Sequence, residues 1–137
     1  MASRPNDRWR REFEEEAAEI AQGTRPSDEI YARVLWPESL IASTDAALAS
    51  FEDELHALRS APDEDILDVV KRAVLTLNSI NNQHVRAGYC GYETGERDSL
   101  CEYFDATVGE CGIDVPALIA RNGLKGWEGL ADGWREW

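Results

Sequence analysis

The feature that most constrains the fold is the spacing of apolar side chains after residue 63. They recur every three or four positions, at Ile66, Val70, Ala73, Val74, Leu77 and Ile80. Because an α-helix has 3.6 residues per turn, this spacing places them on one helical face. Asp63 is the predicted N-cap, with Glu64 and Asp65 in the first turn, and the helix is expected to reach about Asn82.

A second long helix is predicted from Pro37 to about Arg59. Its apolar positions fall at heptad-like steps, at Leu40 or Ile41, Leu48, Phe51, Leu55 and Leu58. The link to the next helix, "SAPDEDI", is short, so the two helices should form an antiparallel hairpin.

Shorter helical patterns flank this hairpin. One runs from a cap at Asn6 or Asp7 to Gln22, and another follows Ser27 until Pro37 ends it near Trp36. A third follows a cap at Thr94 and closes at Gly112, with Leu100, Cys101, Phe104, Val108 and Cys111 as its stripe, and "DVPALIARNG" is a fourth that stops at Gly123. We predict a single all-α domain over residues 1–137, a bundle of five to six helices in which Ala87–Glu93 is irregular. Only "GYCGYE" within that stretch is a candidate extended segment.

The last residues carry a tryptophan pattern. Trp127, Leu130, Trp134 and Trp137 share one helical face, although the intervening glycines disfavour a helix that stands alone. The tail therefore either completes the core or docks on a partner. The core is favoured, because exposed tryptophans are unusual in a monomer.

The charge balance excludes several classes of partner. The chain has 27 acidic and 14 basic residues, a net charge of −13. Such a surface repels nucleic acids and anionic membranes and attracts basic proteins. No apolar run is long enough to span a bilayer, and "MASRPNDRWRREFEEE" lacks the apolar region of a secretory signal. The odd number of cysteines, three, then indicates reduced thiols in a cytoplasm.

Acids concentrate near one end of the predicted hairpin. The candidate acidic docking surface there consists of Glu52, Asp53, Glu54, Asp63, Glu64 and Asp65. Runs of charged residues usually form a solvated surface, and acids in the first turn of a helix also interact favourably with its dipole. This interpretation is favoured over a docking surface.

The stretch from Asn81 to Phe104 crowds polar, aromatic and thiol groups together. The candidate ligand or partner contacts in it are His84, Tyr89, Tyr92, Glu93 and Arg97. In the favoured interpretation these residues join two helices, with the tyrosines covering helix ends and His84 near a helix C-terminus. In the alternative, Arg97 clamps a carboxylate or phosphate of a small ligand.

Two chemical readings of the same stretch are less favoured. His84 could activate Cys90, but nearby acids such as Glu93 oppose a thiolate. His84, Cys90, Cys101 and Cys111 could bind zinc, but no C-x-x-C or H-x-x-x-H clamp is present. We assign no catalytic residue, no metal site and no cofactor.

"ETGERDSLC", from Glu93 to Cys101, and the terminal "WREW" resemble a family of small uncharacterised bacterial proteins with the pattern E-T-x-E-R-x-x-L-C. The matching positions are Glu93, Thr94, Glu96, Arg97, Leu100 and Cys101. The resemblance covers roughly the last half of the chain. It implies a cytoplasmic bacterial protein and supplies no activity.

Three functional classes follow from these patterns. The leading hypothesis is a non-enzymatic interaction protein, such as an inhibitor or immunity-type protein that neutralises a basic partner. The alternatives are a ligand-binding protein or enzyme using the Tyr89–Arg97 region, and a metal protein. The first helix or the tryptophan tail could also pair two copies of the chain.

Overall fold

The computed structural model describes residues 2–26, 32–124 and 127–137. These residues contain six helices and no strand. The helices are α1 (Pro5–Gln22), α2 (Ala32–Leu35), α3 (Glu38–Ala57), α4 (Asp63–Arg86), α5 (Thr94–Glu110) and α6 (Val115–Arg121). The expected all-α class is confirmed, whereas the proposed cap at Ser27 lies outside the described residues.

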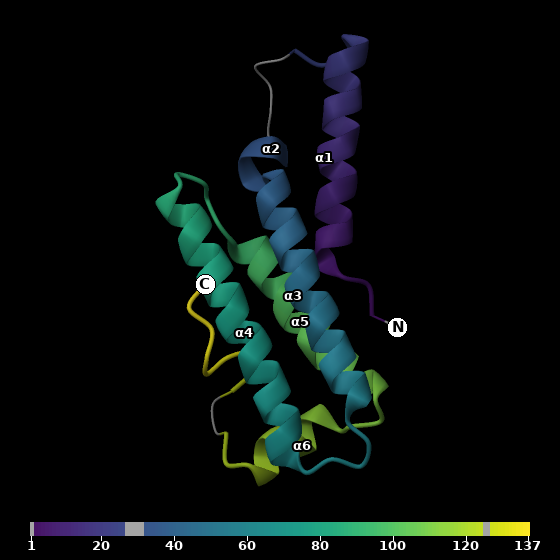
Figure 1. The fold of residues 1–137 in the computed structure, drawn as a ribbon, viewed down its shortest axis with the longest axis vertical. Coiled ribbons are helices and arrows are strands. Elements are labelled where there is room, and N and C mark those ends of the chain that lie inside the picture. The colour runs from purple at the N-terminus through teal and green to yellow at the C-terminus, as the bar shows by residue number, and fades with distance from the viewer. Residues whose placement is uncertain (1, 27–31, 125–126) are drawn as a thin grey trace.

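The antiparallel hairpin of α3 and α4 is the centre of the bundle (Figure 1). Pro37 and Pro62 precede the two helices in extended geometry, at φ −60° and −63°. Because proline fixes φ near this value and lacks an N–H, each suits a helix start. The chain therefore turns back within the short link from Leu58 to Pro62.

Helix α4 continues four residues beyond its predicted end at Asn82. Two polar side chains near this end of α4, one before and one within the extension, face the protein interior. Asn81 Oδ1 accepts a hydrogen bond from the Tyr92 N–H at 2.8 Å, and His84 is buried against α3. The last turns are thus held by hydrogen bonds to other elements, which hydrophobic periodicity alone does not reveal.

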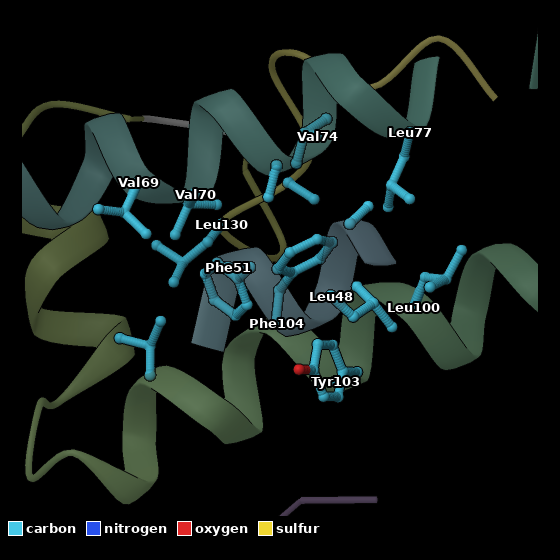
Figure 2. Packing of buried hydrophobic residues seen from close by; sticks show 14 of the residues in the cluster. Leu48, Phe51, Val69, Val70, Val74, Leu77, Leu100, Tyr103, Phe104 and Leu130 are labelled. Atoms are coloured by element: carbon cyan, nitrogen blue, oxygen red, sulfur yellow. The ribbon is translucent and has the colours of Figure 1, made fainter. Parts of the chain in front are cut away.

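The remaining helices cover the hairpin. α1 packs on α3, α2 and α5, and its C-terminal half extends past the rest of the bundle (Figure 1). α5 lies behind the hairpin in the view of Figure 1, and α6 packs against α5. Figure 2 shows the resulting core, in which Phe51 and Phe104 meet edge to face with ring centroids 4.9 Å apart.

The C-terminal segment completes this core through turns rather than through a helix. Leu130 is fully buried and Trp137 is 8% exposed, so the favoured interpretation of the tail agrees with the structure. Trp127 and Trp134 pack edge to face, with centroids 5.0 Å apart. A Cβ at Gly133 would collide with the Trp127 ring, which explains why this close packing needs glycine there.

Several predicted helix ends are wrong in detail. Thr94 and Asp63 are the first residues of their helices and not caps, and the preceding Glu93 and Pro62 make no side-chain cap bond. α1 begins at Pro5, ahead of the predicted caps Asn6 and Asp7. Cys111, predicted on an apolar stripe, is exposed at the end of α5. At α1 and α4, a proline, Pro5 or Pro62, stands at the helix start in place of the expected polar cap.

Candidate functional site

Arginines from other parts of the chain pair with three of the six acids of the predicted docking surface, and with Asp45 nearer the start of α3. Arg4 Nε donates to Glu52 Oε2 at 2.6 Å, and Arg4 Nη1 donates to Asp45 Oδ1 at 2.8 Å. The Glu52 side chain is only 9% exposed. Glu52, predicted as part of a docking surface, therefore serves to hold the N-terminal segment against α3.

Two more predicted docking acids are paired. Asp63 accepts two hydrogen bonds from Arg121, at 2.6 and 2.9 Å, and Glu54 lies 3.6 Å from Arg72. The hydrogen bonds from Arg121 lower the pKa of Asp63 to about 2. Asp53, Glu64 and Asp65 are exposed at this end of the hairpin. The structure thus leaves only part of the predicted acidic surface open to solvent.

His84, predicted as a contact residue, is committed to the scaffold. It is 5% exposed, and its Nδ1 lies 2.8 Å from the Ile80 carbonyl oxygen. Its Nε2 lies 2.9 Å from Ser39 Oγ, so the ring bridges α4 and α3. With both ring nitrogens engaged, His84 is placed to fix the hairpin.

Tyr92 is also part of the interior. Its hydroxyl lies 2.6 Å from Thr44 Oγ1, and burial raises the pKa of the phenol. The Tyr92 ring packs against Trp9 and Trp137, with centroids 6.1 and 5.4 Å away. This side chain joins the N-terminal helix, the hairpin and the C-terminal segment.

The other predicted contacts lie at the surface. Tyr89 is 41% exposed and its ring is 6.1 Å from that of His84, while Glu93 is exposed. Arg97 lies 3.8 Å from Asp98 and not against Glu93, the partner four residues away. Tyr92, Glu93 and Arg97 line an open depression of about 530 Å³ at the start of α5. The structure therefore brings three of the five predicted residues to one place.

A second concave region lies between α5 and the C-terminal turns, and we name it the acidic cleft. Its volume is about 430 Å³, within the roughly 300–1,000 Å³ range of ligand pockets. Five of its side chains are acidic and two are arginines. The lining residues are Arg97, Asp98, Cys101, Glu102, Asp105, Glu128, Gly129, Asp132 and Arg135.

Carboxylate-to-backbone hydrogen bonds give the acidic cleft its shape. Asp105 Oδ1 accepts the Leu130 N–H at 3.0 Å, and Asp132 Oδ2 accepts the Glu128 N–H at 2.6 Å. A Cβ at Gly129 would lie 2.7 Å from Asp105 Oδ2, so only glycine allows this approach without a shift. Residues about 25 positions apart in sequence thereby meet at one site.

The electrostatics of the acidic cleft favour an incoming cation. Burial, and then the charge of Asp132, raise the pKa of Asp105, although the Leu130 N–H opposes the shift. The two cleft arginines lie 3.8 Å from acids, Arg97 from Asp98 and Arg135 from Asp132. In the described part of the chain, Glu102, Asp105 and Glu128 have no salt bridge. A cationic group would offset the cost of keeping the Asp105 carboxylate charged.

The thiols are unpaired, with Cys101 lining the cleft. Burial raises the pKa values of Cys101 and Cys111, which disfavours the reactive thiolate at neutral pH. Within residues 2–26, 32–124 and 127–137, no three His, Cys, Asp or Glu side chains are grouped to hold a metal ion. No helix in the same ranges is both long enough and apolar enough to cross a bilayer.

The sequence patterns identified one of the nine cleft residues, Arg97, as a candidate contact. Asp105 and Asp132 were missed, because neither stands in a motif and their proximity depends on how the tail folds back. The segments Glu93–Cys101 and Trp134–Trp137 contribute other residues to the cleft wall, but neither contains Asp105 or Asp132. Comparison with known protein families, curated proteins and solved structures gave no match to this chain. The resemblance therefore stays a prediction.

Proposed function

We propose that this chain is a non-enzymatic binding protein for a basic protein partner, and that the acidic cleft receives a lysine or arginine side chain of that partner. The observation that carries this proposal is the lining of the cleft, where five acidic side chains outnumber two arginines in a concave space. An inhibitor or immunity-type role fits such a surface.

Long-range electrostatics supports the same kind of partner. The net charge of −13 attracts a basic protein and speeds its encounter. The cleft then offers the half-buried carboxylate of Asp105, where a charge pair is screened less than on the open surface. The whole surface would therefore act on the rate of encounter, and the cleft on the lifetime of the complex. We further propose a reducing cytoplasm as its setting, supported by the three free thiols.

The experiment is a titration with a peptide rich in lysine and arginine, followed by tryptophan fluorescence. Trp127 and Trp134 pack in the segment that forms one cleft wall, which makes them useful reporters. The double variant Glu102→Gln/Asp105→Asn should weaken binding about tenfold or more, because it removes the charge of the half-buried Asp105 together with that of its neighbour Glu102. Affinity should also fall steeply with salt.

A matched control removes the same charge from the hairpin end. Glu64→Gln/Asp65→Asn deletes two exposed acids that have no ion pair in the described part of the chain. We expect this variant to bind within about twofold of the parent, because exposed charges contribute little. Equal losses in both double variants, or an affinity independent of salt, would contradict the proposal.

A further inference from the structure

The outer face of α4 differs in charge from the rest of this acidic chain. Residues 69–92 contain no Asp or Glu, while Lys71, Arg72 and Arg86 lie among them. The large hydrophobic side chains that the described structure exposes also fall within this stretch. They are Leu75 at 45%, Val85 at 50% and Tyr89 at 41%. A second protein surface would meet no acidic side chain from this stretch itself.

A straight stripe runs along the exposed side of α4. Asp68, Leu75, Ser79 and Arg86 are spaced by seven, four and seven residues, which places them on one helical face. All four are exposed. In the described part of the chain neither Asp68 nor Arg86 has an ion-pair partner, so the stripe has an unpaired acid at one end and an unpaired base at the other.

We propose that this stripe binds the same stripe of a second copy, with the two α4 helices antiparallel about a two-fold axis. The order of the charges along the stripe indicates that its partner is a second copy of the same chain. Asp68 and Arg86 lie nine residues on either side of Leu77. An axis at the level of Leu77 therefore brings each Asp68 opposite the partner copy's Arg86, about 13 Å from the axis.

The apolar contact falls near the centre of this arrangement. Leu75 is two residues from the level of the axis, so the two copies of its side chain meet across it. Each copy then covers an exposed leucine and gains two symmetric ion pairs, as an isologous interface requires. One helix pair is a small interface, so we expect weak, concentration-dependent dimers.

The test is sedimentation velocity of the full chain over micromolar to millimolar concentrations, at low salt. The parent should dimerise, and Arg86→Asp should raise the dissociation constant at least tenfold by placing like charges opposite each other. Asp68→Arg should do the same. The double variant Asp68→Arg/Arg86→Asp should restore the parent value, because the swap returns opposite charges to the same pairs.

The swap separates this proposal from a simpler reason for the charge order. Acids at the start of a helix and bases at its end also suit the dipole of an isolated helix. The swapped variant reverses that order, so restored dimerisation can only come from pairing between copies. Arg11→Asp, an exposed reversal on α1, is the matched control and should leave the dissociation constant unchanged. A parent that stays monomeric at millimolar concentration, or a swap that fails to restore the dimer, overturns the proposal.

Discussion

The hairpin end and the acidic cleft are both rich in carboxylates, yet they differ in what those carboxylates do. Between residues 38 and 68, four of nine acids pair with arginines from other parts of the chain. These four are Asp45, Glu52, Glu54 and Asp63. In the cleft, Glu102, Asp105 and Glu128 have no salt bridge in the described ranges. The two regions thus pair similar shares of their acids, four of nine and two of five. The arginines of the first region come from other helices or segments, whereas those of the cleft stand one and three positions from their acids.

The difference shows that a run of acids in a sequence is not yet an acidic surface. Arg4 and Arg121 lie more than forty residues from the acids with which they pair. Conversely, the cleft gathers acids from residues 98–105 and 128–132, which no single run contains. Local charge counting therefore overestimates the first region and misses the second.

The largest expected effect concerns the structural role of the hairpin acids. Arg4→Met should destabilise the fold by about 3 kcal/mol, because it leaves the buried Glu52 carboxylate without its partner. Urea unfolding followed by circular dichroism measures this free energy. Adding Glu52→Gln should recover much of the loss, since the uncompensated charge is then removed.

The control for this prediction is an exposed pair on α1. Arg8 lies 2.9 Å from Glu12, and its side chain is 75% exposed. Arg8→Met should cost less than about 1 kcal/mol, as surface pairs do. Equal losses for Arg4→Met and Arg8→Met would show that Glu52 does not depend on Arg4, and the contrast between the two acidic regions would weaken.

The next effect concerns the wall of the cleft. Gly133→Ala places a methyl group into the Trp127 ring and should cost about 1–3 kcal/mol, as overpacking does. Gly109→Ala is the matched control, because a Cβ there meets no atom within 4 Å and the position is helical. That control should be neutral or stabilising by up to about 1 kcal/mol. Thermal unfolding of both variants measures the two changes in stability. A Gly133→Ala variant as stable as the parent would contradict the close packing of the tail.

A smaller effect is expected at Asp105, where one substitution should change peptide binding without lowering the stability of the fold. Its pKa is raised in the folded state, so its charged form opposes folding once the pH exceeds that value. Asp105→Asn should therefore leave Tm at neutral pH unchanged or raise it by a few degrees, while it weakens binding of the basic peptide. A calorimetric scan beside the peptide titration provides both readings. A lower Tm together with unchanged binding would assign Asp105 to structure alone.

The smallest effect is the pH response of Asp63. A lowered pKa means that its pair with Arg121 stabilises the fold above the ordinary pKa of aspartate and loses that contribution as the pH falls towards about 2. The Tm difference between the parent and Asp63→Asn should therefore shrink between about pH 4 and pH 2. Arg121→Gln should show the same profile, because it removes the other half of the pair. A difference that stays constant through this range would place the stabilisation elsewhere.

The helices were predictable because their apolar stripes are regular. The hairpin and its short link follow from spacing and from Pro37, and the irregular joint at Ala87–Glu93 follows from the lack of an apolar stripe there. The end of α4 was not predictable, since Asn81 and His84 are polar and only their tertiary partners explain their burial.

The site was less predictable than the fold for a physical reason. Asp105 and Asp132 gain their significance from a tail that folds back through glycine turns, and turns leave no periodic pattern. Of the predicted contact residues, His84 and Tyr92 are buried in the interior. Their side-chain chemistry alone does not distinguish such residues from ligand contacts. Hydrogen-bonding side chains are used in both roles, so position in the fold has to decide between them.

The most direct test of where a basic partner binds is NMR mapping with ¹⁵N-labelled protein and the lysine- and arginine-rich peptide. If the acidic cleft is the binding site, amide shifts will concentrate at Asp98–Asp105 and at Gly129–Asp132. Shifts confined to Asp53, Glu54 and Glu64–Asp68, with the cleft amides unmoved, would contradict the account.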